Sequence, residues 1–370
     1  MLFFFSFSSI VTLFFSHFFF SFFFSVESYV GFVSNALVVG EIEGAKYMRV
    51  TGVRFYQLKS PGSAYFDSNE PLTDPATGST LSHMCIQLAK YYASGSFYFS
   101  RDRDITLNSQ QRLTEDTAHP GASLWDHIDE RFFWNRYPLK DLIRLQRLKQ
   151  NFVDRHRLLL PLIQGFVSIT DILVQDKYIK VALISRLSCE RAGTRLNVRG
   201  VDDLGHVANF VETEQYLFSK NFAISYVQIR GSVPVFWEQA GFQVGKADFD
   251  VVREEIAARP AFQRHFDMLL RMYGRQHVVN LLAPGTGNES ELVNAYEQSL
   301  KQFKSDKIEY TNFDLNHEFR SNDGNLVKLV SRLQESLDTF QFFLYDALSK
   351  EIVIKQGGVF RTNCIDCLDR

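Results

Sequence analysis

This chain contains few cysteines and carries little net charge. Its 370 residues include only 4 Cys, without the paired spacing of the disulfide frameworks that are typical of secreted domains. The 40 Lys and Arg nearly balance the 42 Asp and Glu, so the net charge of −2 provides no overall attraction to nucleic acid or to an anionic membrane. We therefore expect a reduced, cytoplasmic protein without a nucleic-acid partner, whose affinity for membranes comes from a local patch.

Basic residues are absent from the start of the chain, where Phe, Ser and Leu make up most of residues 1–28. The length is close to that of a membrane span, and the apolar run resembles the core of a signal peptide. However, no Lys or Arg precedes Lys46, and there is no small-residue cleavage site. Pyrimidine-rich DNA that is translated by mistake also encodes Phe, Ser and Leu. Of these three interpretations we expect the last, so that residues 1–28 are an artefact of the gene model.

No internal repeat is present, and the apolar pattern changes near Pro138. Upstream of it, short β-type runs with Gly-containing turns predominate, together with one helical segment at residues 83–93. Downstream, helical segments alternate with short apolar runs. The expected helices are 247–273, 290–304 and 325–346, and the expected strands are 181–187, 207–211, 222–229, 278–282, 308–313 and 352–354. This alternation predicts an α/β fold, α+β overall, with a mixed sheet flanked by helices.

The most informative segment is the last one, where five residues separate Cys364 from Arg370. Phosphatases that attack phosphorus with a thiolate use this spacing, because a loop of that length can point its N–H groups at one anion. Such N–H groups and a guanidinium lower the pKa of the thiol, which is otherwise about 8.5. Arg also pairs two phosphate oxygens at once. A short strand at Val359 and Phe360 would deliver this loop to the carboxyl edge of the sheet, where α/β folds hold anions.

The residues around this spacing resemble the signature of a known family. Residues 361–370 fit the pattern Arg-x-Asn-Cys-x-Asp-Cys-Leu-Asp-Arg of the Sac-domain phosphoinositide phosphatases. Upstream segments match the same family in the same order, at residues 129–135, 183–195, 197–200, 206–215 and 229–239. Within the family the likeness is strongest to the synaptojanins, and it covers residues 29 to 370.

The resemblance implies a β-rich N-terminal Sac subdomain at 29–138 and a catalytic subdomain at 139–370, incomplete at its C-terminus. The implied activity is hydrolysis of inositol-ring phosphates of phosphatidylinositol phosphates through a phosphocysteine, in membrane traffic and endocytosis. The implied partners are phosphoinositide lipids at a membrane surface, and endocytic proteins bound through C-terminal regions beyond this sequence. We therefore expect a cytoplasmic protein that is peripheral to membranes.

Under this resemblance Cys364 is the nucleophile and Arg370 clamps the phosphate oxygens. The rest of the phosphate-binding loop is Ile365, Asp366, Cys367, Leu368 and Asp369. Asp366 is a candidate proton donor or water activator, and in the alternative both Asp366 and Asp369 brace the loop. Cys364 and Cys367 also form a Cys-x-x-Cys pair, but no second Cys pair or His pair accompanies it. We therefore expect neither a metal nor a cofactor.

A second function remains open, in which the Sac domain docks on phosphoinositide membranes and a downstream 5-phosphatase domain performs the main chemistry. The presence of both Cys364 and Arg370 favours the enzyme. The sequence ends at Arg370, before the helix that should follow the loop and stabilise its bound anion. A chain that ends there is expected to be inactive, because nothing downstream would immobilise the loop.

Two basic series are candidates for contact with anionic lipid. One is a predicted basic helix at residues 136–157, which fits a solvated helix face equally well. The other comprises Arg186, Arg191, Arg195 and Arg199. The sequence alone does not decide whether these residues contact lipid.

Overall fold

The fold of the chain was derived from a computed structural model. The structure describes residues 3–6, 28–57, 65–67, 84–119, 127–140, 143, 160–193, 198–240, 248–284, 289–314, 317–318, 326–363 and 365. Most of the basic segment 136–157 and most of the leader 1–28 therefore lie outside the described residues.

The chain folds as two compact units. The first comprises Met1–Leu107 with Gly121–Thr170, and the second comprises Asn108–Pro120 with Asp171–Arg370. These units divide near residue 170, whereas the subdomain limits expected from the sequence, 29–138 and 139–370, remain a prediction.

The first unit is a mainly antiparallel sheet with one helix packed on it. Its elements are β1 (Phe3–Ser6), β2 (Ser28–Ile42), β3 (Ala45–Gln57), β4 (Tyr65–Asp67), α2 (Met84–Tyr92), β5 (Phe97–Ser100), the 3₁₀ turn η1 (Glu130–Phe132) and the part of β6 (Ile163–Val174) up to Thr170. The strands follow the order β1-β2-β3-β5-β6, and β4 pairs with β3. The hairpin between β2 and β3 turns at Glu43 and Gly44, which both have positive φ, and this favours a tight two-residue turn. Strand β1 lies within the predicted leader and pairs antiparallel with the start of β2.

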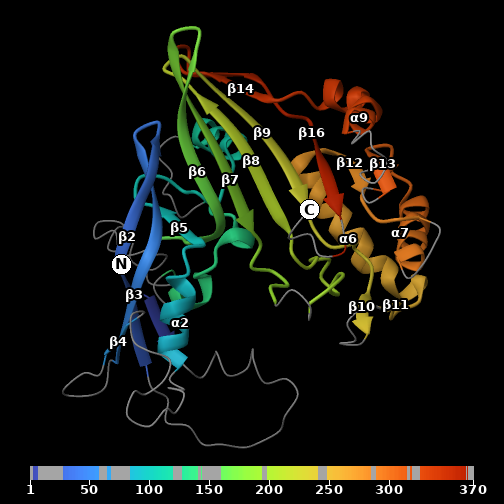
Figure 1. The fold of residues 1–370 in the computed structure, drawn as a ribbon, viewed down its shortest axis with the longest axis horizontal. Helices are drawn as coiled ribbons and strands as arrows, with labels where there is room; N and C mark the ends of the chain where they lie inside the picture. Colours follow the sequence, from blue (N-terminus) through green and yellow to red (C-terminus); the bar gives the residue numbers. More distant parts are fainter. Residues whose placement is uncertain are drawn as a thin grey trace, which may run out of the picture. The chain divides into compact units, whose positions relative to one another are not determined.

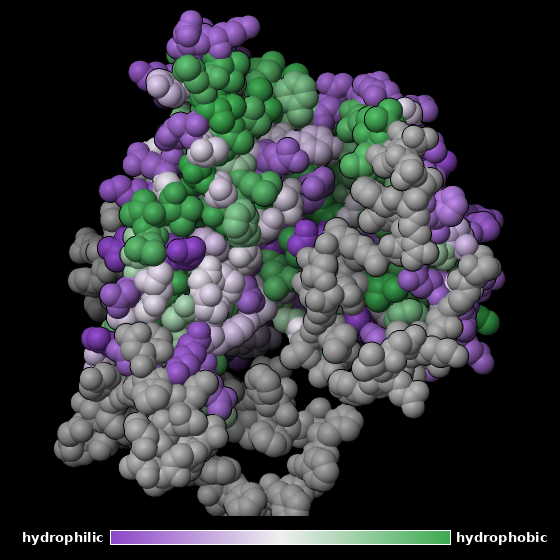
Figure 2. Space-filling view, in the orientation of Figure 1, coloured by the Kyte–Doolittle hydropathy of each residue, from purple (hydrophilic) through white to green (hydrophobic). Residues whose placement is uncertain are grey.

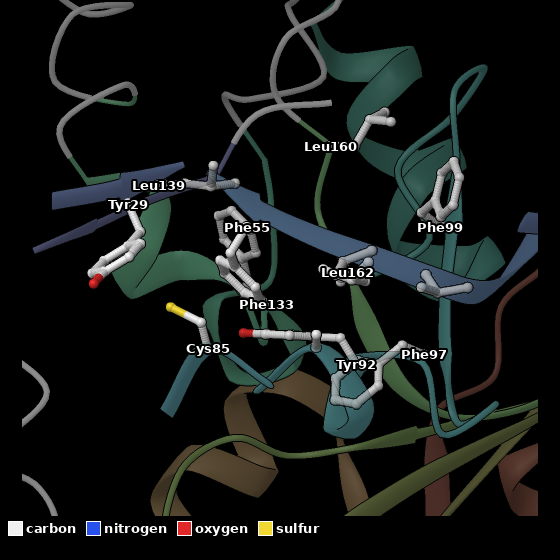
Figure 3. Packing of buried hydrophobic residues seen from close by; sticks show 13 residues of the cluster. Tyr29, Phe55, Cys85, Tyr92, Phe97, Phe99, Phe133, Leu139, Leu160 and Leu162 are labelled. Carbon is white, nitrogen blue, oxygen red and sulfur yellow. The ribbon is translucent and has the colours of Figure 1, made fainter. Parts of the chain in front are cut away.

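Aromatic side chains fill the core of this unit, as Figure 3 shows. Tyr92 of α2 packs against Phe97 of β5 with ring centroids 4.9 Å apart. Phe133 is buried in the same cluster, and Asn135 is fully buried. The Asn135 side chain accepts a hydrogen bond from the Leu162 N–H and donates one to the Leu160 carbonyl. The segment 129–135, which carries part of the family resemblance, thus contributes to the packing of the first unit.

The second unit contains the mixed sheet that the sequence predicts, and its helices confirm the expected α/β class. Its further elements are α3 (Ser109–Ala118), β7 (Lys177–Leu187), β8 (Val211–Phe218), β9 (Phe222–Arg230), β10 (Trp237–Ala240), β11 (Asp248–Val251), α6 (Glu255–Tyr273), β12 (Arg275–Asn280), α7 (Glu289–Phe303), β13 (Ile308–Asn312), α9 (Leu326–Phe340), β14 (Phe343–Asp346), β15 (Glu351–Ile354) and β16 (Gly358–Asn363). The strand order is β7-β8-β9-β16-β12-β13. Strands β9, β16, β12 and β13 are parallel, so all four end at one edge of the sheet (Figure 1).

Helices cover both faces of the parallel strands. Successive side chains of a strand point to opposite faces. Phe360 of β16 packs against Phe340 of α9, while its neighbour Arg361 contacts His265 of α6 and Tyr296 of α7. Helix α9 therefore covers one face of the sheet, and α6 and α7 cover the other.

A buried ionic network joins β7 and β8. Arg186 of β7 is 2% exposed and pairs with Glu212 at 3.1 Å and Glu214 at 2.9 Å. The hydroxyl of Tyr273 donates to Glu212 at 2.6 Å, and Ser225 donates to Glu214 at 2.8 Å. Burial acts to raise the pKa of Glu214, but the charge of Arg186 and hydrogen bonds from Ser109 and Ser225 hold that pKa below its ordinary value. Glu212 and Glu214, two acidic residues of the segment 206–215, therefore have a structural role in this buried network. Contact with a substrate is not needed to account for them.

Exposed apolar side chains gather at the tip of the β6–β7 hairpin, where Leu173 is 59% exposed and Tyr178 is 76% exposed. Figure 2 shows the apolar surface around the end of these strands. Strand β7 begins at this tip and runs parallel to β9, since both are antiparallel to β8. The tip therefore lies at the opposite end of the strands from the edge at which β16 ends. Within the described part of the chain, every helix is too short or too polar to cross a lipid bilayer.

Candidate active site

The predicted phosphate-binding loop follows β16 directly. This strand ends at Asn363, next to Cys364, at the edge that β9, β12 and β13 share. Ile365 is described, whereas Cys364, Asp366, Cys367, Leu368, Asp369 and Arg370 lie outside the described residues. Their roles remain predictions, whereas the structure describes the groups around the end of β16, which precedes the loop in the chain.

Arg361 anchors the end of β16. Its side chain is fully buried, and its Nη2 donates to the carbonyl of Ser232 at 2.8 Å. Its Nε donates to Nε2 of His265 at 3.2 Å, and its Nη1 donates to the hydroxyl of Tyr296 at 3.3 Å. None of these three described partners is a carboxylate, so a positive charge is held three residues before Cys364.

His265 is neutral in this arrangement. Burial, and then the charge of Arg361, hold the pKa of His265 well below its ordinary value. Its Nδ1 lies 2.9 Å from the carbonyl of Gly205 and donates to it, which leaves Nε2 as the acceptor for Arg361. Both ring nitrogens are therefore occupied, and His265 does not offer a lone pair to a metal.

Two asparagines fix the direction in which the chain leaves the sheet. Asn363 and Asn280 are register partners at the ends of β16 and β12, and the side chain of Asn363 donates to that of Asn280. Asn280 in turn donates to the hydroxyl of Tyr310 at 3.0 Å. The carbonyl of Asn363 accepts from the N–H of Leu281 at 3.0 Å. The last peptide before Cys364 is thus tied to the neighbouring strand.

Arg199 contacts the predicted loop itself. Its Nη1 donates to the carbonyl of Ile365 at 3.0 Å, and its Nη2 donates to the side chain of Gln239 at 2.8 Å. Arg191 donates through Nε and Nη2 to the carbonyl of Arg199, so a second arginine holds the backbone from which Arg199 projects.

The basic series 186–199 therefore has structural partners at each described position. Arg186 belongs to the buried ionic network, Arg191 binds a backbone carbonyl and Arg199 binds the loop. Arg195 lies outside the described residues. The sequence offered Arg199 only as a candidate for contact with lipid and gave no sign of its contact with Ile365. It also assigned no role to Arg361, although the residue begins the signature.

Gly200 is required beside Arg199 for two reasons. Its φ of +61° lies in the left-handed region, and a Cβ there would collide with the carbonyl oxygen of Val235. Its N–H donates to the Ser232 hydroxyl at 3.0 Å, and its carbonyl accepts from the Ala208 N–H. This glycine lets the chain cross closely over the segment that follows β9.

Gly200→Ala is expected to destabilise the second unit and to reduce activity. The left-handed φ alone costs about 1–2 kcal/mol with a Cβ present, and the collision with Val235 adds to it. Gly95→Ala is the matched control, because Gly95 has φ +88° but open space at its Cβ. Thermal unfolding of the two variants isolates the contribution of the close contact. Equal losses of stability would contradict this account of Gly200.

These supports suit an anion. A buried guanidinium lies beneath the end of β16, and another holds a loop carbonyl. The described side chains here are mainly arginine and amide groups, which donate hydrogen bonds to phosphate oxygens but are poor metal ligands.

Comparison with known proteins agrees with this geometry. The family model described as SacI homology domain matches residues 19–320. The chain is 40% identical over 288 residues to inositol-1,4,5-trisphosphate 5-phosphatase 1 of Schizosaccharomyces pombe. The aligned region covers 76% of the chain and 26% of that relative. The chain is 38% identical over 351 residues to human Synaptojanin-1, and this aligned region covers 92% of the chain and 20% of the relative.

A third relative is the polyphosphatidylinositol phosphatase INP53 of Saccharomyces cerevisiae, 37% identical over 300 residues that cover 78% of the chain and 26% of the relative. The chain belongs to the SacI homology domain family, as its motifs led us to expect. It spans about a quarter or less of the length of these three relatives.

Proposed function

We propose that this chain is the catalytic domain of a phosphoinositide phosphatase, which removes phosphate from the inositol ring of phosphatidylinositol phosphates at a cytoplasmic membrane surface. The observation that supports the proposal is the end of the central parallel strand β16 at Asn363, two residues after the buried guanidinium of Arg361, because Cys364 is the next residue of the sequence. The names of two relatives, one a polyphosphatidylinositol phosphatase, support this substrate class.

The proposed reaction has two steps. The Cys364 thiolate attacks phosphorus, so that an S–P bond forms while the bond from phosphorus to the ring oxygen breaks and that oxygen takes up a proton. Water then attacks the phosphocysteine, the S–P bond breaks, and inorganic phosphate leaves with the thiolate restored. Arg370 neutralises charge on the phosphate oxygens in both steps, and Asp366 is the candidate proton donor.

The full-length protein is expected to release phosphate from vesicles that contain phosphatidylinositol 4-phosphate, at an undiminished rate in excess chelator. A thiolate nucleophile needs no metal to form at neutral pH, unlike a metal-bound hydroxide. The measurement is phosphate release with and without EDTA.

The docking function remains the second candidate, because a relative named as a 5-phosphatase shares only 26% of its length with this chain. If EDTA stops phosphate release, the activity belongs to a metal-dependent site elsewhere, and this chain serves as a membrane-docking module. Endocytic protein partners are part of the same proposal.

A further inference from the structure

Strand β13 forms one edge of the sheet in the second unit (Figure 1). It pairs in parallel with β12 over five consecutive residue pairs, without a register shift. Among the strands that the structure describes, β12 is its only partner. The strand contains neither a proline nor a bulge, two devices with which proteins block pairing at a sheet edge. Its outer side is therefore suited to accept a further strand.

The hydrogen bonds to β12 determine which backbone groups of β13 face outward. The Lys307 carbonyl accepts from the N–H of Gln276 at 2.9 Å. At the other end of the strand, the N–H of Phe313 donates to the Asn280 carbonyl at 2.8 Å. In parallel pairing, alternate residues of a strand direct their N–H and C=O to the same neighbour. The odd-numbered residues therefore face β12, and Tyr310 directs both its N–H and its C=O to the outer side.

A groove of about 400 Å³ lies between α7 and β13. Ile308 and Tyr310 of β13 line it together with Leu300 and Phe303 of α7. The Tyr310 ring is held in place, because its hydroxyl accepts a hydrogen bond from Asn280 at 3.0 Å. An apolar side chain that enters the groove therefore meets a wall that is already formed.

The lining of the groove is weakly basic. Lys301 and Lys304 contribute to it and are both exposed. Among the described residues that line the groove, Glu297 alone is acidic, so two positive charges stand against one negative charge. A ligand with negative side chains is therefore favoured over a basic one.

We propose that the β13 edge and this groove bind an extended, acidic segment of a partner protein, which adds a strand to the sheet. The backbone of the segment pairs with the N–H and C=O of Tyr310. Every second side chain of the segment then lies over the groove, where apolar groups contact Leu300 and Phe303 and carboxylates lie near Lys301. The inference goes beyond the proposed phosphatase function and does not depend on it, because none of these residues belongs to the loop at 364–370.

A small anion fits these groups less well than a strand does. The outward carbonyl of Tyr310 needs a hydrogen-bond donor, which phosphate dianions and carboxylates lack. Leu300, Phe303 and Ile308 also offer apolar surface that a small anion leaves exposed to water. A peptide strand supplies a donor, an acceptor and an apolar side chain at once.

The test measures binding of a synthetic peptide to the full-length protein by fluorescence anisotropy. In the labelled peptide Thr alternates with two Val and then two Glu, so that Val and Glu share one face of the strand. Saturable binding with a Kd below about 1 mM is expected. Two further versions carry N-methyl groups, one on the Thr amides and the other on the Val and Glu amides. One version should bind about tenfold more weakly and the other should keep its affinity, because only one side of the peptide pairs with β13.

A charge reversal in the protein tests the groove. Lys301→Glu is expected to weaken binding about fivefold, as the loss of an exposed ion pair allows. A peptide with Lys in place of its two Glu should show the opposite preference and bind Lys301→Glu more tightly than the unmodified protein. Lys177→Glu is the matched control, since it makes the same change at an exposed lysine on β7 and should bind like the unmodified protein.

Three results would overturn the inference. One is the lack of saturable binding of the acidic peptide up to about 1 mM, which would show that the edge is not open in the full-length protein. Another is an equal effect of the two N-methylated versions, because pairing with an edge distinguishes the two sides of a strand. The third is equal affinity of Lys301→Glu and Lys177→Glu for the acidic peptide.

Discussion

Cys364→Ser is expected to abolish phosphate release from phosphatidylinositol 4-phosphate vesicles, with a loss of at least about a thousandfold in rate. A serine hydroxyl is isosteric but remains protonated at neutral pH, so it is a much weaker nucleophile than a thiolate. His265, the buried histidine that contacts Arg361, is not available as a base for this hydroxyl, because both of its ring nitrogens already form hydrogen bonds. The measurement is initial rate at saturating vesicle concentration.

The matched control is Cys189→Ser, which makes the same change at a half-buried thiol between β7 and β8. It should leave the rate within about twofold, as is usual for a conservative change away from the reacting atoms. Persistent activity in Cys364→Ser would assign the reaction to another site and would reject the thiolate mechanism.

Arg186→Met is expected to lower the free energy of unfolding by about 3–5 kcal/mol, because two buried carboxylates lose their shared partner. Glu212 and Glu214 would keep their hydroxyl donors but would face each other without a positive charge. Lys180→Met provides a control on the same strand, since the pair of Lys180 with Asp171 is exposed and its loss should be much smaller. Denaturant unfolding followed by circular dichroism measures both.

In the Arg186→Met variant, the contribution of Glu214 to the pH dependence of stability should change sign. In the unmodified protein the pKa of Glu214 is lowered on folding, so its contribution is present above the unfolded value near 4.5 and is lost as the pH falls through the folded pKa. Without Arg186, burial dominates and raises the folded pKa above the unfolded one. The variant should then recover part of its deficit as the pH falls below that raised value. A constant deficit between pH 7 and pH 4 would contradict this account.

The sequence predicted regular elements well where a single periodic pattern sets them. The expected strand at 222–229 is β9, and the expected helix at 290–304 is α7. The expected strand at 207–211 was wrong, because Asn209 has φ +54° and interrupts the extended chain before β8 begins at Val211. A short apolar run, from which this strand was expected, does not reveal a left-handed residue within it.

Pairing with another strand accounts for two further errors. The helix expected at 247–273 begins only at Glu255, because 248–251 form β11 and pair with β10. The helix expected at 325–346 ends at Phe340, since Phe343–Asp346 form β14 beside β9. In both places the segment fits either period, and pairing with another strand decides between them: β10 is close in the sequence to β11, whereas β9 is far from β14.

The candidate site, too, could be predicted only in part from the sequence. Cys364 and Arg370 could be proposed from their spacing together with the family signature around it, because both patterns are local in the sequence. Arg199 could not, since its contact with Ile365 joins positions 166 residues apart. The partners of Arg361 on α6 and α7 likewise depend on the packing of the sheet.

The most direct test of the central claim is the location of phosphate during turnover. The full-length protein would be mixed with phosphatidylinositol 4-phosphate that carries radiolabel in its ring phosphate, denatured rapidly at alkaline pH and digested. The account predicts that the label is bound to the peptide that contains Cys364, and that the label is absent when Cys364 is replaced by serine. Label on another residue, or turnover without any labelled peptide, would contradict it.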